Sequence, residues 1–177
     1  MKKIMLGIIV SVFSVLVVAP TQASAAPYCG ITWGSLPKSS ATSTTSSLTN
    51  IRTGRHDCYD RIVFDLSNTT ATGYRVEYVS NVYADGSGQL IPLSGGAKLR
   101  IITNVPVYNT SGVVTYNATV GHTLPGVNVT GYNTFRDAKY AGSFEGQTTV
   151  GLGVRARLPF RVFTTGNHVV VDVAHSW

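Results

Sequence analysis

The stretch RHDCYDRIVFDL, residues 55–66, places a charged segment directly before a run of mostly apolar residues. Successive side chains of an extended chain point to opposite faces, so Ile62, Phe64 and Leu66 share one face. The segment HVVVDV, residues 168–173, has the same order of one polar residue, three apolar residues, an aspartate and an apolar residue. Two equivalent core strands of a two-sheet fold explain this echo, and a chance likeness between two strand-like segments is the alternative.

The chain from Leu48 onward has the composition of a β-protein. Val, Ile, Tyr and Thr dominate, Gly and Asn interrupt the runs, and no segment shows the apolar stripe of an amphipathic helix. About ten short strands in one domain predict an antiparallel β-sandwich or a partly closed barrel. The candidate strands are 48–52, 60–66, 73–82, 88–93, 97–104, 113–119, 127–133, 138–145, 148–156, 159–164 and 168–174.

The first 25 residues have the pattern of a secretory signal peptide. Lysines at positions 2 and 3 precede the apolar run 4–19, and small residues follow at 23–25. We predict cleavage after Ala25, because cleavage after Ala26 would leave Pro27 at the first mature position. The apolar run is at the short end of the roughly 17–25 residues that span a bilayer. We therefore expect a secreted protein, extracellular or cell-wall associated, with no membrane span after signal cleavage.

Removing residues 1–25 from the 177-residue chain leaves 152 residues, enough for one domain with a sizeable core. The two cysteines of an exported chain predict a disulfide between Cys29 and Cys58. Such a bond closes a loop of about thirty residues and stabilises the fold by about 3.5 kcal/mol. We divide the mature chain into a disulfide-tethered arm with a flexible Ser/Thr linker, 26–47, and a β-domain, 48–177.

The charge of the chain argues against nucleic acid as a partner. The formal net charge of +6 falls to +4 when Lys2 and Lys3 leave with the signal peptide. The remaining basic residues form no run, which is typical of a weak attraction to anionic surfaces such as wall polymers.

Motifs of metal, phosphate and nucleophile sites are missing from the sequence. It has no HExxH, no paired cysteines at ligand spacing and no G-x-S-x-G elbow. A carboxylate pair for glycosidic cleavage is possible among Asp57, Asp60, Asp65 and Glu145, although ion pairs with arginines explain these residues equally well. We expect no metal, no cofactor and no catalytic residue.

Aromatic residues favour a binding role. Nine tyrosines and two tryptophans lie among Arg, Asn, Asp and Gly, and aromatic faces suit the apolar C–H faces of sugar rings. The alternative is a structural role, because tyrosines of β-sandwiches usually pack in the core or against neighbouring strands. We predict a polar binding patch at a strand mouth, with Trp33 brought beside it by the disulfide; its residues are Trp33, Arg55, His56, Asp57, Asp60 and Arg61.

Several motifs, in order along the mature chain, resemble the AMIN-like domain of secreted bacterial proteins. They are Ile31-Thr-Trp-Gly-Ser35, Gly54–Leu66, Gly73-Tyr-Arg-Val-Glu-Tyr78, Asp85-Gly-Ser-Gly88, Leu93-Ser-Gly-Gly-Ala97, Phe144-Glu-Gly146, Pro159-Phe-Arg-Val162 and Val169–His175. The resemblance implies a β-sandwich of two related sheets. It also implies a likeness in outline to the AMIN module of cell-envelope proteins, which is thought to localise its partners by binding peptidoglycan or another wall polysaccharide.

The sequence as a whole predicts a secreted, non-catalytic domain that binds cell-wall glycan or an anionic wall polymer. Two alternatives stay open. One is a small wall-active hydrolase that uses carboxylates between His56 and Asp60, and the other is a protein-interaction module.

Overall fold

A computed structural model describes residues 27–42, 44–68 and 72–177. The predicted signal peptide, 1–25, and the cleavage-site residues Ala25 and Ala26 lie outside the described residues. The described chain is all-β apart from a short 3-10 helix, η1 (Tyr28–Gly30). Within this part, no helix has both the length and the apolar character needed to cross a membrane.

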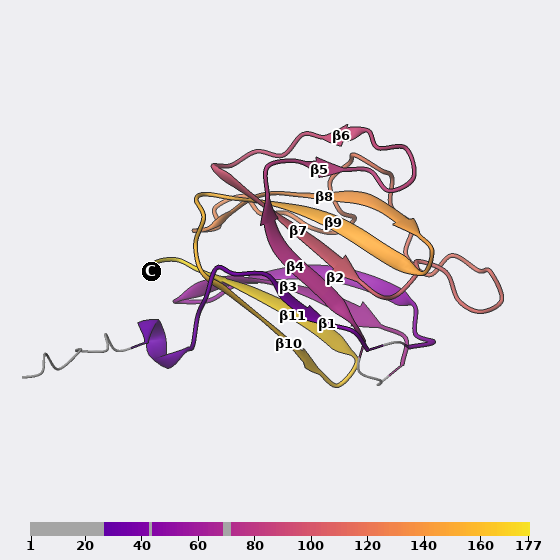
Figure 1. Cartoon of the computed structure of the whole chain (residues 1–177), viewed down its shortest axis with the longest axis horizontal. Coiled ribbons are helices and arrows are strands. Elements are labelled where there is room, and N and C mark those ends of the chain that lie inside the picture. Colours follow the sequence, from indigo (N-terminus) through magenta and orange to yellow (C-terminus); the bar gives the residue numbers. More distant parts are fainter. Residues whose placement is uncertain (1–26, 43, 69–71) are drawn as a thin grey trace, which may run out of the picture.

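The strands form two antiparallel layers that face each other (Figure 1). The first sheet has the order β1 (Lys38–Ser40), β4 (Tyr74–Val79), β7 (Ala97–Thr103), β9 (Gln147–Val154) and β8 (Phe135–Phe144). The second has the order β10 (Phe160–Thr165), β11 (His168–Ala174), β3 (Tyr59–Leu66) and β2 (Leu48–Arg55). A short pair, β5 (Val82–Tyr83) and β6 (Leu90–Ile91), completes the fold. The sheets do not close into a barrel, so the predicted all-β sandwich is confirmed.

The two segments with the same residue pattern, which include 61–66 and 168–173, form neighbouring strands of one sheet. β3 and β11 run antiparallel, with Ile62 opposite Val171 and Phe64 opposite Val169. These side chains are fully buried, in one cluster with residues of the facing sheet such as Leu152. The expected core face of β3 is therefore confirmed, and its likeness to β11 reflects two strands that share the same inner face.

The outer face of the five-stranded sheet is covered. Val82, Ile91 and Leu93, from the segment that carries β5 and β6, form a second buried cluster with Ala141 of β8. Two glycines of β9 permit this close approach. A Cβ atom at Gly153 would lie 1.9 Å from the carbonyl oxygen of Ser94, and one at Gly151 would lie 2.7 Å from Leu93 Cδ1. This leaves the outer face of the four-stranded sheet as the more open broad surface.

Two expected strands, 113–119 and 127–133, are wrong. These residues belong to the long connection between β7 and β8, where only isolated bridges form, such as Tyr108 with Val114. Tyr116 and Val127 are nevertheless buried against the main core. Their side chains cover the edge of the sandwich. The backbone of the two segments forms no ladder with a neighbouring strand.

The stretch expected to be a flexible linker is partly built into the sandwich. β1 pairs with β4, with Lys38 opposite Val76. Ser46 and Ser47 are buried, and the backbone N–H of Ser47 donates to Ser67 Oγ at 3.1 Å. Small hydroxyl side chains suit this position because they satisfy backbone groups locally without requiring volume in the core.

Candidate functional site

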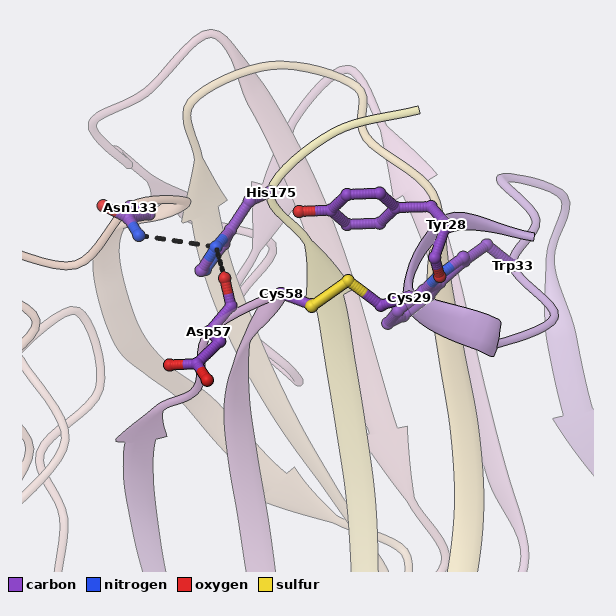
Figure 2. Close-up of a disulfide and its surroundings, with 7 residues drawn as sticks. All are labelled: Tyr28, Cys29, Trp33, Asp57, Cys58, Asn133 and His175. Carbon is purple, nitrogen blue, oxygen red and sulfur yellow. Dashed lines mark hydrogen bonds between the residues drawn. A yellow bond between two sulfur atoms is a disulfide. The ribbon is translucent and has the colours of Figure 1, made fainter. Parts of the chain in front are cut away.

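The disulfide fixes the arm, residues 27–37, to one end of the sandwich. Cys29 is bonded to Cys58 across a Cα–Cα distance of 6.4 Å, which confirms the predicted pairing. Figure 2 shows Trp33 on the Cys29 side of the bond and His175 on the Cys58 side. A backbone hydrogen bond from Phe160 N to Gly34 O, 2.9 Å long, holds the arm a second time. The arm is therefore an ordered part of the domain at this end.

Tyr59 is the centre of an aromatic and cationic cluster on the outer face of the four-stranded sheet. The ring of His56 stacks on it with a centroid distance of 4.5 Å, and the ring of Trp33 lies 5.9 Å away. The guanidinium groups of Arg61 and Arg161 lie 5.2 and 5.3 Å from its ring centroid, within the range of cation–π attraction. Trp33 thus contacts Tyr59, whose ring is also contacted by His56 and Arg61.

Asp172 forms ion pairs with both arginines of this cluster. Its carboxylate is fully buried and accepts hydrogen bonds from Arg61 Nε at 2.6 Å and Arg161 Nε at 2.7 Å. The hydrogen bond to Asp172 raises the pKa of the Arg61 guanidinium. A buried carboxylate requires such partners, since an unpaired charge in the interior is costly. Arg61 therefore has a defined structural role whether or not it also contacts a ligand.

Asp60 lies inside the sandwich rather than on its surface. Its side chain is fully buried, and one carboxylate oxygen accepts the backbone N–H groups of Thr134 and Phe135. The other oxygen lies 3.1 Å from His175 Nε2. The physical reason is the alternation of the strand, which gives Asp60 the same face as the core residue Ile62.

The remaining predicted residues separate at the loop before β3. Arg55 is exposed and donates to the carbonyl oxygen of Gly131. Asp57 is exposed, and its backbone carbonyl lies 3.2 Å from His175 Nδ1 (Figure 2). The predicted patch is therefore three groups: a cluster around Tyr59, two exposed residues at the end of β2 and in the following loop, and one buried carboxylate.

An apolar groove lies between the arm and the segment 175–177. We call it the arm groove; its volume is about 260 Å³, and its lining residues are Pro27, Tyr28, Ile31, Thr32, Trp33, Pro159 and Trp177. Trp177 is 69% exposed, and its indole N–H donates to the carbonyl oxygen of Arg157 at 3.3 Å. Sequence reasoning selected Trp33 but missed Tyr28 and Trp177 as its partners, because only their aromatic character signals a role.

The same end of the sandwich is rich in arginines that have no acidic partner. In the described part of the chain, no carboxylate lies within ion-pair distance of these residues, and each donates to backbone carbonyls instead. All of them are exposed; they are Arg55, Arg136, Arg155 and Arg157. Among them, Arg157 contacts the arm groove, because its carbonyl oxygen accepts the indole N–H of the lining residue Trp177.

The carboxylates considered for hydrolysis do not meet in one place. Asp57 and Asp60 are at the start of β3, whereas Asp65 is near its end and pairs with Arg52 and His168. Glu145 lies in the turn between β8 and β9. Among the residues that the structure describes, no three His, Cys, Asp or Glu side chains gather as a metal site would require.

The family model of the AMIN-like domain matches residues 46–175. The chain belongs to the AMIN-like domain family. AMIN-like domains are associated with the cell envelope, so membership indicates an envelope-associated module. The AMIN-like match covers every strand of the sandwich except β1, and it excludes Tyr28, Trp33 and Trp177. The arm groove is therefore formed where the AMIN-like sandwich meets its flanking segments.

No curated protein and no solved structure matches the chain significantly.

Proposed function

We propose that this protein is a non-catalytic, cell-envelope-associated domain that binds a wall polysaccharide in the arm groove. The observation that carries the proposal is the convergence of Tyr28, Trp33 and Trp177 on one exposed hollow, held in place by the disulfide. Aromatic side chains offer flat apolar faces to the C–H faces of sugar rings. A rigid groove also lowers the entropy cost of binding, because its side chains are ordered before the ligand arrives.

The polar groups around the groove suit a binding role better than a hydrolytic one. The groove is lined by no carboxylate or histidine among the described residues. Asp60, the nearest buried carboxylate of β3, is engaged by two backbone N–H groups and faces His175. In a glycosidase, one carboxyl group must reach the glycosidic oxygen. The other must reach the sugar carbon or the water molecule that attacks it.

The expected secretion agrees with this role. The sequence has the pattern of a signal peptide, and a disulfide is typical of proteins that fold outside the reducing cytosol. A wall polysaccharide is the abundant ligand that such a protein encounters after export.

The test is retention of the disulfide-bonded protein on purified cell walls, with binding constants measured on soluble wall fragments. We expect Trp177→Ala to weaken binding about tenfold or more, because it removes an exposed wall of the groove. Tyr83→Ala is the matched control, since Tyr83 is an exposed aromatic residue on β5, in the segment that covers the other sheet. Mass spectrometry of the fragments should find them unchanged.

Two results would overturn the proposal. Wild-type protein that no wall fraction retains at low salt has no wall ligand. Cleaved fragments would instead identify the protein as a wall-active hydrolase.

A further inference from the structure

Two exposed guanidinium groups converge on a single backbone carbonyl near His175. Arg136 Nη2 and Arg155 Nε donate to the carbonyl oxygen of Asn133 at 3.1 and 3.3 Å. Arg136 Nη1 also donates to the carbonyls of Tyr132 and Phe135, both at 2.8 Å. Arg155 Nη2 donates to the carbonyl of His175 at 2.6 Å. Backbone acceptors therefore hold both side chains in fixed orientations.

This pair lacks the counter-charge that other arginines of the chain have. Arg61 and Arg161 share Asp172, and Arg75 and Arg100 share Glu77. Within the described residues, Arg136 and Arg155 have no carboxylate at ion-pair distance. Two like charges this close repel each other, and an anion between them would relieve the repulsion.

The unused N–H groups of the pair are suited to an oxyanion. A guanidinium has five N–H donors in a planar fork, and the carbonyls engage only some of those on Arg136 and Arg155. Two such forks match the oxygen atoms of a phosphate or a carboxylate, which arginine binds through paired, charge-assisted hydrogen bonds.

The pair is continuous with the arm groove. Arg155 donates to the carbonyl of His175. Two residues after each of these, the indole N–H of Trp177 donates to the carbonyl of Arg157. The segment 175–177 therefore connects the arginine pair to Trp177, which lines the arm groove.

We propose that Arg136 and Arg155 form an oxyanion subsite of the arm groove, so that the ligand is an anionic saccharide rather than a neutral one. The inference rests on the proposed function and narrows its ligand class to a sugar polymer that bears phosphate or carboxylate groups. The groove binds the ring, and the two arginines bind the anionic substituent.

The test compares Arg136→Gln/Arg155→Gln with Arg52→Gln/Arg75→Gln, which removes the same formal charge from two exposed arginines outside the groove. Binding is measured on untreated walls, on walls stripped of phosphate polymers by acid, and on peptidoglycan with amidated carboxylates. The first variant should bind untreated walls about tenfold or more weakly, because each lost charge-assisted hydrogen bond is strong. The control should bind within about twofold of wild type. The treated wall that loses wild-type binding identifies the phosphate or the carboxylate as the ligand group.

A measurement on the wild-type protein tests the subsite independently of whether the variant folds. An arginine-selective dicarbonyl reagent is applied with and without untreated wall fragments, and modified peptides are quantified by mass spectrometry. Bound ligand should protect Arg136 and Arg155 severalfold relative to Arg52 and Arg75. Equal modification with and without ligand, or an affinity unchanged in Arg136→Gln/Arg155→Gln, overturns the subsite. If Trp177→Ala alone loses wall binding, the proposed function stands and the subsite falls.

Discussion

Asp60 owes its role to its place in the alternation of β3 rather than to its charged neighbours. Its side chain points inward with Ile62, where it accepts the backbone N–H groups of Thr134 and Phe135 and lies against the ring of His175. The carboxylate connects the start of β3 to the start of β8, two elements from different sheets. The alternation that puts Ile62 on the core face of β3 also puts Asp60 there, so Asp60 does not belong to the exposed patch predicted from the sequence.

Replacing Asp60 by alanine should destabilise the fold by about 2–4 kcal/mol, because two buried backbone N–H groups lose their acceptor. The measurement is urea unfolding of the disulfide-bonded protein. Asp57→Ala is the matched control, since Asp57 is exposed on the loop before β3, and we expect it to change stability by less than about 0.5 kcal/mol. Equal stabilities of the two variants would contradict the assigned role of Asp60.

Glu77 links stability to pH through its two arginines. Hydrogen bonds from Arg75 and Arg100 lower the pKa of Glu77 from 4.5 to about 2. Because the native state binds the proton less readily than the unfolded state, the ion pairs stabilise the fold fully above pH 4.5. This contribution is lost as the pH falls from 4.5 through about 2.

Glu77→Gln should therefore be less stable than wild type by an amount of order 1 kcal/mol at neutral pH, after allowance for solvent screening at its exposed arginine partners. The stability difference between the two proteins should shrink as the pH falls from 5 and vanish near pH 2. Urea unfolding across that range measures it. A difference that stays constant with pH would show that the charge of Glu77 contributes nothing.

Strand β9 is built to let a second layer of chain lie against it. Gly151 and Gly153 have no side chains on the outer face of the five-stranded sheet, so Leu93 and the backbone of Ser94 approach closely. In a sequence, glycine within a strand predicts such an approach of another backbone, without saying which segment makes it.

Gly153→Ala should destabilise the protein by at least about 2 kcal/mol, because the new methyl group would overlap the carbonyl oxygen of Ser94 and displace the covering segment. Gly54→Ala on β2 is the control, since its Cβ atom would lie 3.9 Å from the nearest side-chain atom, His56 Nε2. We expect a change within about 1 kcal/mol there. Thermal unfolding of both variants measures the contrast, and a tolerated Gly153→Ala would show that the cover is not tightly packed.

Most of the long strands were predicted closely, both inside the sheets and at the β10 edge. β3, β7, β9 and β11 agree with their expected ranges within a few residues, because alternation and β-branched content are local properties. The segments 113–119 and 127–133 have similar composition but form no ladder, since strand pairing depends on a partner elsewhere in the chain. The predicted patch also depended on distant parts of the chain. Most of its residues are close in sequence, but they lie in three different environments.

The molecule as a whole has one covered face, one more open face and one end that gathers aromatic and cationic residues. The segment 82–94 covers the five-stranded sheet, whereas the outer face of the four-stranded sheet has paired charges. The arm and the segment 175–177 meet at a single end (Figure 1). Binding is therefore expected at that end rather than on a sheet face.

Removing the disulfide with Cys29→Ser/Cys58→Ser should cost a few kcal/mol at most, about 3.5 kcal/mol on the chain-entropy account. Hydrogen exchange should quicken in residues 27–37, while the amides of β3 and β11 stay protected relative to the arm. Wall binding should weaken, because Tyr28 and Trp33 lose their fixed positions. Reductant should lower the melting temperature of the wild type and leave that of the variant unchanged; equal melting temperatures of the oxidised and reduced wild type would contradict the role of the bond.

The fold class, the inner face of β3 and the disulfide could all be inferred from the sequence of this AMIN-like protein. Each depends on alternation, on composition, or on there being two cysteines to pair. The pairing of Arg61 with Asp172 joins residues 111 positions apart, and it was visible only once β3 and β11 lay side by side. The arm groove and the unpaired arginines beside it also depend on strand order and on the path of the arm. Contacts of that kind are set by packing between distant segments, which no local pattern of residues encodes.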